Sequence, residues 1–251
     1  MIVKELQLPE YGTLEMMLHS PSVALNTAYA TKRPAIIICP GGAYACCSAC
    51  ETDPPAIAFL NMGFQAFLLR YPVGKMAGEK RPLFALASAI KLVREYADEW
   101  QTDPNRIAVI GFSAGGHLAA SLGVHWNDPL LAEYCHVQDS RILRPDAMIL
   151  AYPVITAGPY AHRESIEAVS QGCKESNYWC LETQVDEQTP PTFLWHTMDD
   201  GCVPVENSFL FAESLHKHRV ACECHFFQSG PHGLSVATNE VASPSKNVHE
   251  W

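Results

Sequence analysis

Residues 106–124 read RIAVIGFSAGGHLAASLGV. An apolar run at 107–110 leads into Gly111-Phe112-Ser113-Ala114-Gly115, and a stretch rich in Ala and Leu follows. This G-x-S-x-G pattern is typical of a sharp turn between a strand and a helix, where small flanking residues let the chain bend and lift the serine side chain clear of the backbone. The stretch therefore predicts a strand, a tight turn and a helix, with Ser113 presented as a nucleophile.

The rest of the chain alternates short apolar runs with helical segments, which favours an α/β fold with a mostly parallel central sheet flanked by helices. Residues 34–39 (PAIIIC) are apolar throughout, as expected of a buried central strand. Apolar residues in 81–100 recur at helical spacing. We expect strands at 14–19 (an N-terminal edge strand), 34–39, 65–70, 106–110, 147–151, 192–196 and 222–227, and helices at 53–62, 81–100, 114–124 and 205–218.

The length and the even composition of the chain predict a single domain over residues 1–251. An α/β unit often reaches this length, and we find no internal repeat or low-complexity tract. The stretch 152–191 fits no regular element. A loop this long in a compact domain is usually functional or partly helical, so we expect a cap- or lid-like insertion over the active site.

The charge balance limits the partners of the chain. Its formal net charge is -10, whereas binding to nucleic acid or to an anionic membrane surface needs clustered Lys and Arg. Residues 1–10 carry acids and no long apolar run, so we expect no signal peptide and a cytoplasmic location. No apolar stretch has the length of a membrane span. The sequence leaves the oligomeric state open, a homodimer included.

The ten cysteines are expected to be free thiols, because the chain is large and has no export signal. Cys47-x-x-Cys50 and Cys222-x-Cys224 could be imagined as a zinc site, but the second pair lacks the usual gap of two to four residues, so we expect no metal. The sequence suggests no function for Cys46, Cys47 and Cys50.

A serine nucleophile needs a base that takes its proton and an acid that orients the base. In folds with this turn the order along the chain is serine, acid, histidine. Asp199-Asp200 follows the strand at 192–196, and His232 follows the strand at 222–227, so both fall at the carboxyl edge of the sheet. We expect His232 to be the base and Asp200 the acid, with Asp199 bracing the turn.

Two further histidines compete for the role of base. His196 lies within or just after a buried strand, and His117 lies one turn into the helix after Ser113. We expect both to be structural.

The negative oxygen formed by attack of the serine on a carbonyl carbon needs preorganised hydrogen-bond donors, which are often the largest single contribution to catalysis. We expect the backbone N–H groups of Gly42, Ala43 and Ala114 to form this oxyanion hole.

These motifs together resemble the small bacterial esterase/lipase-like α/β-hydrolases, in particular the acetyl-xylan-esterase-like branch related to the hormone-sensitive-lipase group. The resemblance extends from about Pro34 to Gly233. It rests on Pro40-Gly41-Gly42-Ala43-Tyr44, Leu69-Arg70-Tyr71, Gly111 to Ala119, Arg144-Pro145-Asp146, Tyr152-Pro153, His196 to Asp200, Val203 to Ser208 and His232-Gly233. The chain departs from the family at Ala43, which stands where the family has a third turn glycine.

The resemblance implies an α/β-hydrolase fold and cofactor-free hydrolysis of short acyl esters, often acetyl groups on xylose or other plant sugars. It assigns Ser113 as nucleophile, Asp200 as acid and His232 as base. Tyr44, Trp126 and Trp179 are expected to contact a sugar, since aromatic faces suit such ligands. Two alternatives stay open: a peptidase or amidase that uses the same triad, and a non-catalytic binding protein on this fold.

Overall fold

The computed structural model describes residues 1–20, 32–173, 177–239 and 241. Within these residues the strands form one eight-stranded sheet in the order β1-β2-β4-β3-β5-β6-β7-β8. The strands are β1 (Ile2–Gln7), β2 (Thr13–Leu18), β3 (Arg33–Cys39), β4 (Gln65–Arg70), β5 (Thr102–Phe112), β6 (Ala147–Ala151), β7 (Thr192–Thr197) and β8 (Cys222–Phe227).

The strands from β3 to β8 run parallel to one another, and β1 and β2 add an antiparallel pair at one end. The centre is formed by β3 beside β5, where Ile36 pairs with Ala108 and Ile38 with Ile110. Ile36 and Ile38 are fully buried, because helices cover both faces of a parallel sheet. The mostly parallel α/β sheet predicted from the sequence is confirmed.

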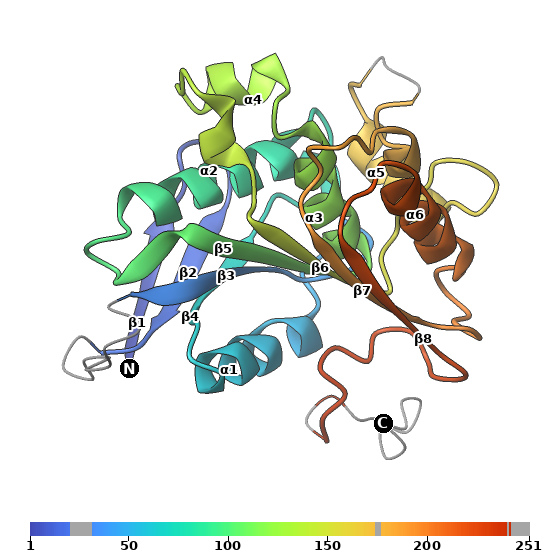
Figure 1. Cartoon of the computed structure of the whole chain (residues 1–251), viewed down its shortest axis with the longest axis horizontal. Helices are drawn as coiled ribbons and strands as arrows, with labels where there is room; N and C mark the ends of the chain where they lie inside the picture. The colour runs from blue at the N-terminus through green and yellow to red at the C-terminus, as the bar shows by residue number, and fades with distance from the viewer. Residues whose placement is uncertain (21–31, 174–176, 240, 242–251) are drawn as a thin grey trace.

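Helices lie on both faces of the sheet (Figure 1). Helix α1 packs beneath β4, and α2, α3 and α6 pack on the other face, against β5, β6 and β7. The α-helices are α1 (Asp53–Asn61), α2 (Arg81–Glu95), α3 (Ala114–His125), α4 (Pro129–Tyr134), α5 (Arg163–Ser170) and α6 (Glu206–Lys217). Short 3-10 turns are η1 (Ala49–Glu51), η2 (Gly74–Met76), η3 (Ser140–Leu143) and η4 (Leu181–Thr183).

The prediction of an edge strand at 14–19 was wrong. The strand is β2, and it lies inside the sheet between β1 and β4. The edge strand at this end is β1, whose residues are mostly exposed and half of them polar, so its sequence does not have the apolar pattern that marks a buried strand. Helix α2 also ends at Glu95, earlier than expected, and Trp100 beyond it packs on Phe67 with ring centroids 5.5 Å apart.

The stretch 152–191 is partly helical. It contains α5 and η4, with residues 174–176 outside the described residues. Val154 and Ile166 pack with Val203 in a small apolar cluster, which fixes α5 beside the carboxyl ends of the strands. In Figure 1, α5 and α6 lie on the face of the sheet that carries α3.

In the described ranges no helix is long and apolar enough to cross a membrane. All ten cysteines lie within these ranges, and no disulfide joins any two of them. Cys39 and Cys135 are buried, whereas Cys46, Cys202 and Cys222 are exposed.

His117 of α3 is buried within the core. Its Nδ1 lies 2.9 Å from the hydroxyl oxygen of Tyr44, and its Nε2 lies 3.3 Å from the carbonyl oxygen of Trp179. Burial lowers the pKa of His117 from 6.5 to about 4, although the Trp179 carbonyl opposes this shift. His117 therefore stays neutral in the folded protein at pH values where the unfolded chain binds a proton there.

This difference makes His117 a source of acid sensitivity. Because the folded pKa lies below the unfolded one, the unfolded chain binds more protons between pH 6.5 and about 4, and stability falls as the pH is lowered through this window. A shift of this size contributes roughly 3 kcal/mol to the difference. Urea unfolding at pH 7 and pH 4.5 should show a smaller loss of stability for His117→Gln than for the parent chain. Equal losses would contradict this assignment.

Candidate active site

Ser113 occupies the turn between β5 and α3 that the sequence predicts. Its φ of 52° lies in the left-handed region, which few non-glycine residues adopt. Two backbone bonds hold this conformation: the Ser113 N–H donates to the Ala151 carbonyl at 3.0 Å, and the Ser113 carbonyl accepts from the Val154 N–H at 3.1 Å. The serine side chain therefore projects from a fixed backbone at the carboxyl edge of the sheet.

Glycines on both sides of Ser113 allow the helix to start so close to the strands. A Cβ on Gly115 would lie 2.0 Å from the Cys39 carbonyl oxygen, and one on Gly111 would lie 2.1 Å from the Gly115 carbonyl oxygen. Both clashes involve backbone atoms, which cannot move without separating α3 from the sheet. The two outer positions of G-x-S-x-G thus have a steric cause.

The structure brings Ser113, His232 and Asp200 together from three separate loops. His232 Nε2 lies 2.8 Å from Ser113 Oγ, and His232 Nδ1 lies 2.6 Å from Asp200 Oδ2. With its proton on Nδ1, the imidazole donates to the carboxylate and accepts the serine hydroxyl proton at Nε2. The three side chains therefore form a connected chain of hydrogen bonds. The serine lies at one ring nitrogen of the base, and the carboxylate lies at the other.

Asp200 has no exposed side-chain surface. Burial alone would raise its pKa, but hydrogen bonds from His196 and His232, the charge of His232 and the Cys202 N–H hold the pKa of Asp200 well below its ordinary value. Oδ1 accepts from the backbone N–H groups of Cys202 and Val203 at 2.8 and 3.0 Å. The carboxylate is thus ionised and fixed in direction.

His196 and Asp199 support this arrangement without facing Ser113. Buried His196 hydrogen-bonds Ser208 Oγ through Nδ1 at 2.7 Å, and its Nε2 lies 3.2 Å from Asp200 Oδ2. Asp199 accepts from the Gly230 N–H at 2.8 Å and from the Ser229 hydroxyl at 2.6 Å, which ties the loop of Asp200 to the loop of His232. Both residues lie where the sequence predicts structural roles.

The loop after β3 turns sharply beside Ser113. Gly42 has a φ of 119°, and Ala43 has a φ of 54°, so Ala43 adopts the left-handed conformation that glycine would favour. Among the described residues, neither the Gly42 nor the Ala43 N–H donates to a protein acceptor, and both residues line the pocket over Ser113. Ala114 is the first residue of α3, where the N–H has no partner within the helix. The predicted donors therefore lie around the serine.

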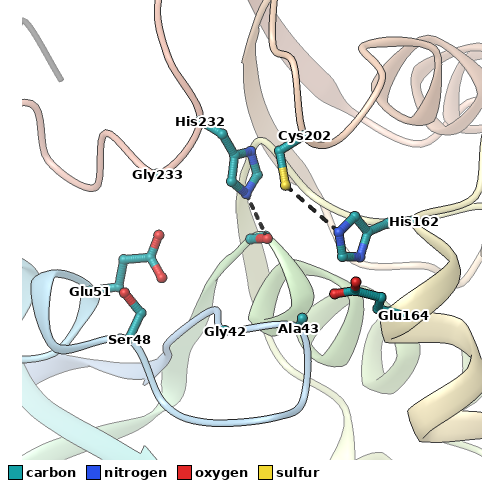
Figure 2. A pocket seen from close by; sticks show the side chains of 10 residues that line it. Gly42, Ala43, Ser48, Glu51, His162, Glu164, Cys202, His232 and Gly233 are labelled. Atoms are coloured by element: carbon teal, nitrogen blue, oxygen red, sulfur yellow. Dashed lines mark hydrogen bonds between the residues drawn. The ribbon is translucent and has the colours of Figure 1, made fainter. Parts of the chain in front are cut away.

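These groups open into a pocket of about 270 Å³. Figure 2 shows Glu51 and Ser48 on one side of it and His162 and Glu164 on the other, with His232 pointing down toward the serine. The lining residues are Gly42, Ala43, Ser48, Glu51, Ser113, His162, Glu164, Cys202, His232 and Gly233. This volume lies just below the usual range of small-molecule sites, which is about 300–1,000 Å³, so the pocket suits a small ligand.

The predicted aromatic contacts to a sugar are wrong. Tyr44, Trp126 and Trp179 are only 0%, 6% and 2% exposed, and none of them lines the pocket. Tyr44 and Trp179 instead pack against His117 beneath the site. An aromatic residue next to a catalytic motif serves the core as readily as a ligand, and the sequence does not show which face is covered.

The side wall is formed instead by His162, Glu164 and Cys202, which we did not predict as site residues. Cys202 Sγ lies 3.7 Å from His162 Nε2. Burial lowers the pKa of His162, and burial together with the charges of Asp200 and Glu164 raises the pKa of the Cys202 thiol. Cys202 follows Asp200 by two residues, so its place in the sequence already indicated that it lies close to the catalytic acid. Neither here nor at any other place among the described residues do His, Cys, Asp and Glu form a group of three that could hold a metal ion.

Comparison with known proteins adds the family context. The model of the BD-FAE family matches residues 22–215. Endo-1,4-beta-xylanase B of Butyrivibrio fibrisolvens is 37% identical over 84% of this chain and 34% of its own length. Acetylxylan esterase of Xylanibacter ruminicola is 27% identical over 81% of this chain and 42% of its own length. The chain thus spans between a third and a half of these curated relatives.

Solved structures extend the comparison to the fold. The acetyl ester-xyloside bifunctional hydrolase of Caldicellulosiruptor lactoaceticus has a TM-score of 0.77 and 38% identity, covering 90% of this chain and 80% of that one. The carboxylesterase Cest-2923 of Lactobacillus plantarum has a TM-score of 0.84 and 27% identity, covering 98% and 90%. These neighbours confirm the predicted α/β-hydrolase fold.

The steric argument at the turn predicts a large loss of stability for Gly115→Ala. The new Cβ would overlap the Cys39 carbonyl oxygen, so we expect the free energy of unfolding to fall by about 2 kcal/mol or more in urea titrations. Gly201→Ala is the matched control, since a Cβ there meets nothing within 4 Å. Its unfolding free energy should stay within about 0.5 kcal/mol of the parent. Similar values for the two variants would refute the close-approach argument.

Proposed function

Because this chain belongs to the BD-FAE family, we propose that it is a serine esterase that removes short acyl groups, acetyl above all, from acylated sugars such as xylo-oligosaccharides. The observation that carries the proposal is the continuous hydrogen-bonded chain from Ser113 through His232 to Asp200. Its serine end lies in a pocket that Gly42 and Ala43 also line. This arrangement can activate a hydroxyl and receive a negative oxygen in the same place.

The first half of the reaction is acyl transfer to the enzyme. Ser113 Oγ attacks the ester carbonyl carbon while His232 Nε2 takes the hydroxyl proton. The carbonyl oxygen becomes negative and accepts hydrogen bonds from the N–H groups around it. The bond to the alcohol oxygen then breaks, His232 returns its proton to that oxygen, and the alcohol leaves. Ser113 keeps the acyl group as an ester.

The second half releases the acid. His232 takes a proton from a water molecule, and the water oxygen attacks the acyl carbon. The resulting intermediate collapses, the proton passes to Ser113 Oγ, and the carboxylic acid departs. Asp200 keeps the imidazole oriented and stabilises its positive charge in both halves. No redox partner or metal takes part in this sequence of steps.

Two observations support a short acyl group on a polar alcohol. The pocket has a volume of only about 270 Å³, which suits an acetyl group better than a long chain. Its side walls present His162, Glu164 and Ser48, whose polar atoms can hydrogen-bond hydroxyl groups. Two of the similar proteins described above, an acetylxylan esterase and an acetyl ester-xyloside hydrolase, point to the same chemistry.

We expect the chain to release acetate from acetylated xylo-oligosaccharides and to cleave 4-nitrophenyl acetate faster than the butyrate. Ser113→Ala should lower turnover by about 10⁴- to 10⁶-fold with the fold intact by circular dichroism. Acetate release is measured enzymatically, and nitrophenol release is measured by absorbance. Cleavage of nitrophenyl esters alone would remove the sugar from the proposal. Near-full activity of Ser113→Ala would refute the serine mechanism.

The two neighbouring aspartates should differ strongly. In Asp200→Asn the side-chain oxygen stays with the Cys202 and Val203 amides, and the new NH₂ group faces His232 Nδ1. The imidazole must then carry its proton on Nε2, where it cannot accept the serine proton, so kcat should fall by about 10³- to 10⁴-fold.

Asp199→Asn provides the comparison, because that side chain contacts Ser229 and Gly230 rather than the imidazole. Its kcat should stay within about tenfold of the parent, as expected of a lost loop contact. Steady-state kinetics on 4-nitrophenyl acetate measures both. A larger loss for Asp199→Asn than for Asp200→Asn would assign the acid to Asp199.

A further inference from the structure

Glu51 is a buried carboxylate in the wall of the active-site pocket that the proposed reaction does not use. It ends the 3-10 turn η1, its side chain points into the pocket in Figure 2, and it is only 2% exposed. Among the described residues, no Lys or Arg forms an ion pair with it, and its partners are neutral donors. A buried charge held in this way lowers stability, so its presence in a reactive pocket suggests a role in function.

One carboxylate oxygen of Glu51 fixes the loop that carries the oxyanion donors. Oε2 accepts the Gly41 N–H at 2.8 Å, and the Gly41 carbonyl accepts the Ser48 N–H at 2.9 Å. Both backbone polar groups of Gly41 are therefore occupied immediately before Gly42. The packing is close: a Cβ on Gly41 would lie 2.7 Å from Glu51 Oε2 and 2.9 Å from Ser113 Cβ. The position of the Gly42 and Ala43 amides relative to Ser113 thus depends on this contact.

The other carboxylate oxygen reaches the loop that carries the base. Oε1 accepts the Tyr152 hydroxyl at 2.7 Å, and the Tyr152 hydroxyl oxygen accepts the Ser235 N–H at 2.7 Å. Ser235 lies three residues after His232, and the Tyr152 ring packs edge-on to the His232 ring with centroids 4.9 Å apart. Burial, together with the charge of Glu51, raises the pKa of Tyr152 well above its ordinary value, so the hydroxyl keeps the proton it donates.

We propose that Glu51 is a positioning residue, whose carboxylate holds the oxyanion loop and the loop of His232 in one fixed arrangement around Ser113. Its two oxygens join segments that are far apart in the chain, the turn at Gly41 and the base loop behind Tyr152. Such an arrangement matters because a misplacement of about 1 Å in a catalytic constellation can reduce the rate about 10²-fold. The inference rests on the proposed serine mechanism, and it adds a residue that acts through the others.

The test uses Glu51→Gln, which keeps size and shape. A glutamine offers one acceptor oxygen, so it can serve either the Gly41 N–H or the Tyr152 hydroxyl, and one link is lost. We expect kcat on 4-nitrophenyl acetate to fall about 10- to 100-fold with KM within about threefold of the parent. The rate at which a fluorophosphonate labels Ser113 should fall by a similar factor, since that reaction needs the same base and oxyanion donors.

Tyr152→Phe provides the second variant. It keeps the ring against His232 and removes the hydroxyl that joins Glu51 to Ser235. If the two side chains act as one unit, the double variant should lose about as much labelling rate as the more severe single variant. Glu182→Gln is the matched control: Glu182, like Glu51, accepts from two donors, here the Thr156 hydroxyl and the Cys180 thiol, but it does not line the pocket. Its kcat and labelling rate should equal those of the parent.

The outcomes separate the two proposals. Unchanged kcat and labelling in Glu51→Gln, or a raised KM at constant kcat, would overturn the positioning role while leaving the esterase intact. Fully multiplicative losses in the double variant would also overturn the link through Tyr152. If the parent cleaves no sugar acetate but is labelled at Ser113, the substrate proposal fails and the labelling series still tests Glu51. A parent protein that cleaves no ester and is not labelled at Ser113 would overturn both the esterase proposal and the positioning role of Glu51.

Discussion

The left-handed backbone of Ser113 is the constraint on which the site depends. It can persist only because β5 lies at the centre of the sheet, where pairing on both sides fixes the strand up to Phe112. Helix α3 must begin at once, so the chain needs glycine at 111 and 115, where any side chain would meet backbone. The same geometry makes Ala114 the first residue of α3, where its N–H has no partner within the helix. The central position of β5, the close packing of α3 and the start of that helix at Ala114 are therefore all tied to one turn.

Parallel topology supplies the other groups. Because β3, β5, β7 and β8 all run in the same direction, the loops after them meet at one edge of the sheet, and each brings a different part of the site. The parallel strands do not by themselves set distances between loops. Asp199 joins the loops after β7 and β8, and Glu51 joins the loop after β3 to the base loop through Tyr152. The strand order thus brings the loops to one edge of the sheet, and side-chain hydrogen bonds between the loops fix their relative positions.

The sequence is informative where a function depends on local chain geometry. Ser113, Asp200 and His232 each follow a strand that the sequence predicts and occupy short motifs, so they could be placed together before any contact was known. Glu51 could not, because its partners lie 10 and 101 residues away and no local pattern marks it. The burial of Tyr44 and Trp179 depends on how α3 and the 152–191 segment pack around His117, which a single sequence does not reveal.

Several parts of this site lower the stability of the fold that holds them. Ser113, Ala43 and Tyr152 have positive φ angles, and Asp200 and Glu51 place carboxylates out of contact with water. Each carboxylate is satisfied by several donors, so the cost is offset by hydrogen bonds whose directions are also the ones that orient the reactive groups. A core that replaced these residues with apolar side chains would gain stability and lose that orientation. The strain and the buried charge are therefore best explained by the geometry that they enforce around Ser113.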